Sequence, residues 1–327
     1  PAAQVNSAFL KIGLTGHSIP TGDSRPAVNL ALVIDRSASM RGQKIEQVKL
    51  AALSALDRLN SDDIVSVVVY HDGVEVVLPA TKLRDPTAAK KAITSITPNG
   101  STALFAGISK AMAEVRENLD DQRVNRIILL SDGQANLGPN SPSELGDLGA
   151  SLRKENIAVT TVGLDLDFNE DLMTELAIRS QGNHYFVEAP GELIATFDYE
   201  LSDIFSVVAQ QVAIQVRIAP GVKPLRVLGY DAEMHGQDIT IQFNQIYANQ
   251  ERFVLIELEI PAGTTQEVRS VAKVQTNYFN MTSQSQRNLA ASTEVRFSPL
   301  RNVVQAALNA DVEEKTALLL ANESNRL

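Results

Sequence analysis

Four oxygen-bearing side chains stand within a few residues of the ends of two apolar runs of this chain. Asp35, Ser37 and Ser39 follow the first run, and Asp132 follows a later one. In parallel α/β sheets, ligands bind at the carboxyl ends of the strands, so these side chains are the first candidates for chemistry. In Asp35-x-Ser37-x-Ser39, alternate residues of an extended turn point the same way, so their oxygens can converge on one point. Because neighbouring carboxylates repel each other, the chemistry expected here is the binding of a hard divalent cation by oxygen ligands.

Strand and helix patterns alternate around these residues. Apolar runs typical of strands in a parallel sheet lie at residues 28–34, 64–70, 124–130, 157–164 and 184–187, and a shorter strand-like run lies at 74–78. Helical stripes lie at residues 43–60, 86–96, 103–118, 142–156, 169–180 and 191–206. This alternation predicts an α/β fold with a doubly wound, mainly parallel sheet over residues 24–203.

The remaining sequence has a different pattern. Alternating segments separated by turn-rich stretches lie at residues 212–218, 238–243 and 252–260. They predict an antiparallel β-sandwich over residues 204–298. An alternating segment within residues 1–23 is expected to supply a further strand to this sandwich, so that the α/β domain is an insertion between its strands. Residues 299–327 read as a helical segment.

Composition narrows the function classes. The chain of 327 residues has no cysteine, which excludes disulfides, thiolate metal sites and thiol catalysis. Its 39 acidic against 29 basic residues give a net charge of −10, which argues against nucleic acid as a partner and favours cations. No apolar run approaches the roughly 18 residues of a membrane span, and no signal segment opens the chain. We therefore expect a soluble chain, for which cytoplasmic and extracytoplasmic locations both stay open.

The order of elements and these motifs resemble the von Willebrand factor type A (VWA) domain, in the stand-alone form found in bacteria. The family carries a metal-ion-dependent adhesion site (MIDAS) with three parts: Asp-x-Ser-x-Ser after the first strand, a Thr on a Gly-containing loop, and an Asp after the next central strand. The matching positions here are Asp35, Ser37, Ser39, Thr102 and Asp132. The resemblance covers about residues 27–200.

The resemblance implies roles for these five residues. Ser37 and Ser39 would be direct metal ligands, Asp35 and Asp132 would hold the metal and its waters, and Thr102 would join when ligand binds. Mg²⁺ is the expected ion, with Mn²⁺ and Ca²⁺ as alternatives. An acidic side chain of an unidentified partner protein would supply the last ligand. The function implied is therefore a non-enzymatic, metal-dependent module for adhesion or scaffolding.

Two other function classes stay open at this stage. One is a Mg²⁺-dependent phosphoryl-transfer hydrolase with Asp35 as nucleophile. The pattern of such enzymes has a second acidic residue two positions after the nucleophile, where this chain has Ser37. The other is a structural domain whose metal site is vestigial.

Overall fold

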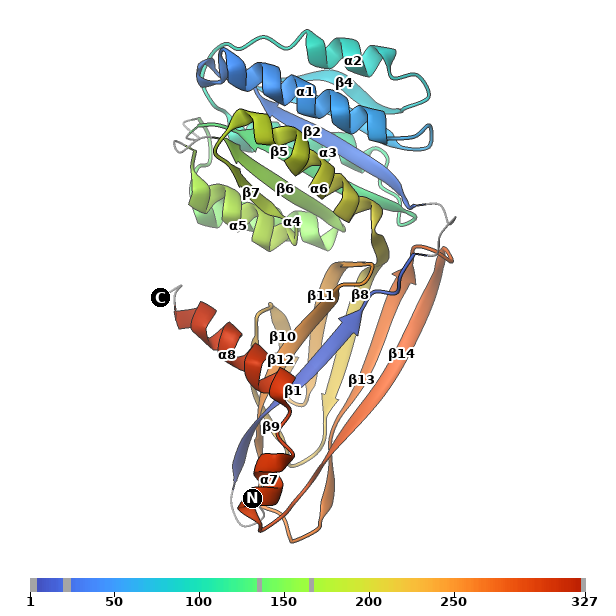
Figure 1. Ribbon diagram of the computed structural model, residues 1–327, viewed down its shortest axis with the longest axis vertical. Helices are drawn as coiled ribbons and strands as arrows, with labels where there is room; N and C mark the ends of the chain where they lie inside the picture. The colour runs from blue at the N-terminus through green and yellow to red at the C-terminus, as the bar shows by residue number, and fades with distance from the viewer. Residues whose placement is uncertain (1–4, 20–24, 134–136, 165–167, 325–327) are drawn as a thin grey trace. The chain divides into compact units, whose positions relative to one another are not determined.

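The chain folds into two compact units. The computed structural model describes residues 5–19, 25–133, 137–164 and 168–324. One unit, called here the α/β unit, comprises Ile19–Val207. The other, called the sandwich unit, combines Pro1–Ser18 with Val208–Leu327 (Figure 1). The α/β unit therefore interrupts the sandwich unit in sequence.

A six-stranded sheet forms the centre of the α/β unit. Its strands are β2 (Ala27–Asp35), β3 (Ile64–Tyr70), β4 (Val74–Lys82), β5 (Arg123–Ser131), β6 (Ile157–Leu164) and β7 (His184–Val187). They lie in the order β4-β3-β2-β5-β6-β7, and every neighbouring pair is parallel except β3 with β4. Strand β4 runs further than its predicted end at residue 78 and includes Pro79, which an edge strand tolerates because that strand has one unpaired side.

Helices cover both faces of this sheet. They are α1 (Gln43–Arg58), α2 (Thr87–Thr94), α3 (Leu104–Arg116), α4 (Pro142–Lys154), α5 (Glu170–Ser180) and α6 (Leu193–Phe205). Helices α3, α4 and α5 share one core cluster with alternate residues of the strands, such as Ala31 and Val33. Helices α1 and α6 pack together on the opposite face (Figure 1). Since both faces are covered, the central strands are buried throughout, as their continuous apolar runs predict.

The sandwich unit contains two antiparallel sheets. Its strands are β1 (Asn6–Thr15), β8 (Val207–Ile218), β9 (Lys223–Leu228), β10 (Ala232–His235), β11 (Asp238–Tyr247), β12 (Glu251–Ile260), β13 (Val268–Asn280) and β14 (Ser285–Arg296). One sheet has the order β1-β12-β9 and the other β10-β11-β8-β13-β14. The N-terminal strand β1 pairs with β12 from Asn6 opposite Ile260 to Thr15 opposite Glu251. Two helices follow, α7 (Arg301–Ala306) and α8 (Ala310–Ser324). The domain boundaries expected after residues 23, 203 and 298 stay predictions.

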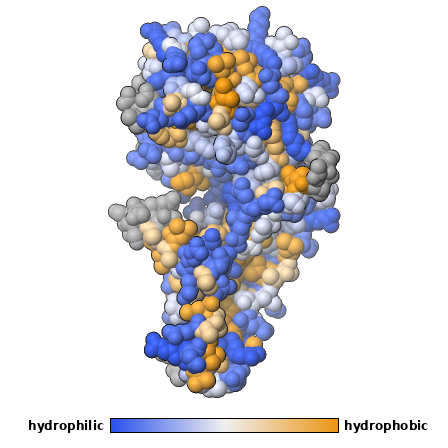
Figure 2. Space-filling model, viewed as in Figure 1, coloured by the Kyte–Doolittle hydropathy of each residue, from blue (hydrophilic) through white to orange (hydrophobic). Residues whose placement is uncertain are grey.

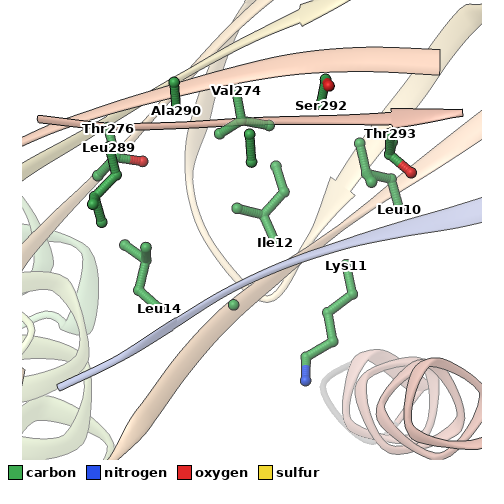
Figure 3. A pocket seen from close by; sticks show the side chains of 12 residues that line it. Leu10, Lys11, Ile12, Leu14, Val274, Thr276, Leu289, Ala290, Ser292 and Thr293 are labelled. Carbon is green, nitrogen blue, oxygen red and sulfur yellow. The ribbon is translucent and has the colours of Figure 1, made fainter. Parts of the chain in front are cut away.

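A groove of about 410 Å³ lies between β1 and the pair β13 and β14 (Figure 3). Leu10, Ile12 and Leu14 of β1 point toward Val274 of β13 and Leu289 of β14. Both β1 and β14 are edge strands of their sheets, so the groove lies between the two sheets at one of their edges.

The visible surface of the α/β unit is largely hydrophilic, with apolar residues in small separate groups (Figure 2). Among the residues that the structure describes, no helix combines the length and the apolar composition needed to cross a membrane.

Candidate metal site

The two acidic candidates lie at neighbouring strand ends in the middle of the sheet. Strand β2 ends at Asp35, and β5 ends at Ser131, directly before Asp132. Because β2 and β5 are parallel neighbours with Ile34 opposite Leu130, their carboxyl ends meet at one edge of the sheet. The fold therefore brings both carboxylates to the edge at which ligands of such sheets bind.

Asp35 is a fully buried carboxylate. The backbone N–H of Ser37 donates to its Oδ1 at 2.8 Å, and Ser131 Oγ donates to its Oδ2 at 2.9 Å. Burial raises the pKa of Asp35 to about 6, the Asp132 carboxylate acts in the same direction, and the hydrogen bonds from Ser37 and Ser131 oppose the shift. A carboxylate in this environment gains from a nearby positive charge, because burial penalises the charged form.

Hydroxyl groups connect the turn after β2 to Asp132. Ser37 Oγ lies 2.9 Å from Ser39 Oγ, and Ser39 Oγ donates to Asp132 Oδ1 at 2.7 Å. Ser39 precedes α1 in a short 3₁₀ turn, Ala38–Met40, which aims its side chain back toward the strand ends. The predicted convergence of hydroxyls and carboxylates is thus present in the geometry.

Thr102 reaches the same place from the loop before α3. Its side chain is buried, and a Cβ atom on Gly133 would lie 3.6 Å from Ser39 Oγ and 3.7 Å from Thr102 Oγ1. Both hydroxyls therefore border the space beside Gly133. The Thr102 loop is fixed to the turn after β2 because Ala38 N–H donates to the Gly100 carbonyl at 3.0 Å.

An exposed carboxylate also holds this loop. The backbone N–H of Ser101 donates to Asp72 Oδ1, and this hydrogen bond lowers the pKa of Asp72. Ala103 N–H donates to the His71 carbonyl at 2.9 Å, which ties the start of α3 to the end of β3. The loop that carries Thr102 is thereby anchored on both sides.

Two further residues contact the candidates, and the sequence patterns do not single them out. Ser131 donates to Asp35, as described above, and its place before Asp132 is the signal that could have identified it. Lys44, in the first turn of α1, places its Nζ 2.8 Å from Asp132 Oδ2. Its signal is weaker, because a lysine on an amphipathic helix usually belongs to the solvated face.

The set of donor atoms fits a hard divalent cation. Two carboxylates and three hydroxyls come together from three separate loops, and such oxygen ligands suit Mg²⁺, Mn²⁺ or Ca²⁺. Within the described ranges, no group of three or more His, Cys, Asp or Glu side chains is arranged to hold a metal. A metal ion bound by the described residues would therefore need hydroxyl oxygens as well as carboxylates, and the five candidate residues supply both.

The fold and the position of this site define a doubly wound α/β domain with an oxygen-rich site where its central strands end. Residues 29–199 match the family model of the von Willebrand factor type A domain, which is more than half of the chain, so the chain belongs to this family. Domains of this family often mediate metal-dependent protein interactions.

Relatives extend the similarity beyond the matched domain. The chain is 30% identical over 247 residues to the uncharacterized protein sll0103 of Synechocystis sp., covering 72% of this chain and 58% of the relative. It is 24% identical over 242 residues to the uncharacterized protein YfbK of Escherichia coli, covering 72% of this chain and 42% of that protein. The chain thus spans about half the length of these curated relatives.

A solved structure shares the fold of nearly the whole chain. A von Willebrand factor type A protein from Catenulispora acidiphila superposes with a TM-score of 0.74 over 96% of this chain and 79% of that one, at 17% sequence identity. This similarity concerns the fold, and it confirms the predicted combination of a mainly parallel sheet with antiparallel sheets and helices.

Proposed function

We propose that this protein is a metal-dependent protein-binding module in which a divalent cation captures an acidic residue of a partner protein. The residues proposed to hold the cation are Asp35, Ser37, Ser39, Thr102 and Asp132. The observation that carries the proposal is the continuous contact from Ser37 Oγ through Ser39 Oγ to Asp132 Oδ1, at 2.9 and 2.7 Å, beside the buried Asp35 carboxylate.

The charge of the donor groups supports capture of an external carboxylate. When bound, the cation supplies an open coordination position that a carboxylate oxygen of the partner can fill. The hydroxyls of Ser37, Ser39 and Thr102 can ligate without adding negative charge. The two aspartates already balance a divalent cation, and the hydroxyls add no further negative charge, so an external carboxylate meets no excess of negative charge from these ligands.

The position of Asp35 argues against the hydrolase alternative. A nucleophilic carboxylate must present an oxygen to its substrate. Asp35 is fully buried, and its two oxygens accept hydrogen bonds from Ser37 N–H and Ser131 Oγ. Those contacts support a structural role for Asp35 beneath the cation, and we propose binding rather than catalysis.

Mg²⁺ is the proposed ion, with Mn²⁺ and Ca²⁺ as alternatives. All five candidate ligands offer hard oxygen atoms, and Mg²⁺ commonly keeps several waters and few protein carboxylates. Calorimetric titration of metal-stripped protein with each ion in turn would identify the preferred one.

The decisive experiment compares two Asp→Asn variants in that titration. Asp35→Asn removes the buried charge with little change of shape, and it should abolish saturable 1:1 binding. Asp57→Asn, on the last turns of α1 and away from the site, should bind as the wild type does. Absence of metal binding by the wild-type protein would favour the structural domain with a vestigial site.

A further inference from the structure

Lys44 makes a direct ion pair with one of the proposed metal ligands. Its Nζ lies 2.8 Å from Asp132 Oδ2, and the side chains are 22% and 0% exposed. The other oxygen of Asp132 accepts a hydrogen bond from Ser39 Oγ. Asp132 therefore contacts the Ser39 hydroxyl through one oxygen and the Lys44 ammonium group through the other.

The placement of Lys44 is not explained by the stability of α1. Lys44 is the second residue of this helix, and the positive end of the helix dipole disfavours cations in the first turn. Acidic residues are preferred there, and Glu46 occupies such a position two residues later. The ion pair with the fully buried Asp132 carboxylate is the interaction that offsets this cost.

Because of Lys44, the net charge of the site changes from negative to positive when a divalent metal ion binds. The two carboxylates of Asp35 and Asp132 are balanced in part by the Lys44 ammonium, which leaves one negative charge. The site with a divalent cation then carries one positive charge. One carboxylate from a partner protein makes the metal-loaded site neutral. Without Lys44, the two aspartates alone would already balance the charge of the metal ion.

We propose that Lys44 sets the metal affinity of the site and couples metal binding to the capture of a carboxylate. This inference rests on the proposed function. In the free protein Lys44 weakens metal binding by repulsion, and an acidic residue of the partner removes the excess charge, so each ligand strengthens the binding of the other. Lys44 is therefore a positioning and tuning residue and not a metal ligand.

The test measures Mn²⁺ and Mg²⁺ affinity by calorimetry in the wild type and in Lys44→Met, which keeps the aliphatic stem and removes the charge. Each titration is repeated with a saturating capped Gly-Glu-Gly peptide and with Gly-Gln-Gly as its neutral control. Lys44→Met should bind metal about tenfold more tightly than the wild type without peptide, since repulsion between like charges a few ångströms apart is lost. The Glu peptide should tighten metal binding in the wild type and much less in the variant.

Matched variants separate charge from packing. Lys49→Met removes a charge from the same helix, where Lys49 pairs with Glu46, and it should leave both affinities unchanged. Lys44→Arg keeps the charge and should behave as the wild type. Lys44→Gln keeps a hydrogen-bond donor toward Asp132 and should behave as Lys44→Met, and it serves as the neutral variant if Lys44→Met fails to fold, which circular dichroism would show.

The outcomes distinguish this inference from the proposed function. Equal metal affinity in the wild type, Lys44→Met and Lys44→Gln, or an equal effect of the Glu peptide on all three, overturns the role of Lys44 alone. Absence of metal binding in the wild type and in both neutral variants overturns the proposed function and this inference together.

Discussion

Arg126 and Glu200 form an ion pair that is closed to solvent, with Nη1 of Arg126 lying 3.5 Å from Oε1 of Glu200 and side-chain exposures of 0% and 1%. Thr160 Oγ1 donates to the same Oε1 at 2.6 Å, and Asn183 Nδ2 donates to Oε2 at 2.9 Å. Arg126 belongs to β5, Thr160 to β6 and Glu200 to α6. A buried ion pair therefore holds α6, the last helix of the α/β unit, against the sheet in addition to apolar contacts.

Glu200→Gln is expected to destabilise the protein by about 3–5 kcal/mol, because it leaves a buried guanidinium without its carboxylate. Urea denaturation followed by circular dichroism measures this change in the free energy of unfolding. A double variant, Arg126→Met with Glu200→Leu, should recover most of the loss, since no charge then stays buried.

The matched control is Asp198→Asn on the same helix. Asp198 pairs with Arg58 at 3.2 Å, but its side chain is 51% exposed. An exposed pair of this kind contributes at most about 1 kcal/mol. Equal losses in Glu200→Gln and Asp198→Asn would show that burial of the Arg126 pair adds nothing.

Asp35 gives the metal-free protein a distinct pH dependence. Its pKa is raised from 3.8 to about 6 on folding, mainly by burial. The folded state therefore binds a proton more tightly than the unfolded state does. The stability linked to this proton is fully present below the unfolded pKa of 3.8 and is lost as the pH rises through about 6. The loss amounts to as much as about 3 kcal/mol.

Urea denaturation in the presence of a chelator, from about pH 4 to pH 7.5, measures this dependence. Asp35→Asn carries no titrating group at this position, so the difference between wild type and variant isolates the Asp35 contribution. The wild type should lose stability relative to Asp35→Asn as the pH rises. Parallel curves would mean that the Asp35 pKa does not change on folding.

The position of the candidate site was predictable because it depends on two local facts. Continuous apolar runs identify β2 and β5, and the first acidic residues after them, Asp35 and Asp132, must lie at or next to the strand ends. That the two strands are neighbours follows from the fold class, and β2 indeed pairs with β5. Local sequence and fold class together thus account for the carboxylates.

The contact of Lys44 with Asp132 was not predictable in the same way. It depends on the direction in which α1 starts after Gly42, whose φ of 79° few other residues adopt readily, and on the rotation of the helix. The helical stripe fixes only that Ile45 and Val48 face inward. Strand β14 was similarly hard to place, because most of its residues are exposed and give no burial pattern.

Proton and metal should compete for Asp35, so the stabilisation by metal should depend on pH. Adding saturating Mg²⁺ to chelator-treated protein should raise the melting temperature at about pH 7.5, where the carboxylate is ionised, and raise it less at about pH 5. Differential scanning calorimetry measures both shifts. Asp132→Ala should show a much reduced shift at either pH, and a wild-type shift independent of pH would exclude Asp35 from the metal-binding groups.

Gly133→Ala separates folding from metal binding. The added methyl would lie 3.6 Å from Ser39 Oγ and 3.7 Å from Thr102 Oγ1, which is ordinary van der Waals contact. The free energy of unfolding without metal should therefore change by no more than about 0.5 kcal/mol. The methyl nevertheless fills space between two proposed ligands, so calorimetric metal affinity should fall by about tenfold or more.

Gly191→Ala is the matched control for that substitution, because a Cβ atom at Gly191 meets nothing within 4 Å and the residue lies in a short 3₁₀ turn, Pro190–Glu192. It should preserve both stability and metal affinity. If Gly133→Ala binds metal as tightly as the wild type does, the cation must lie away from the space that Ser39 and Thr102 border. The two hydroxyls would then act only through their hydrogen bonds within the loops, and not as metal ligands.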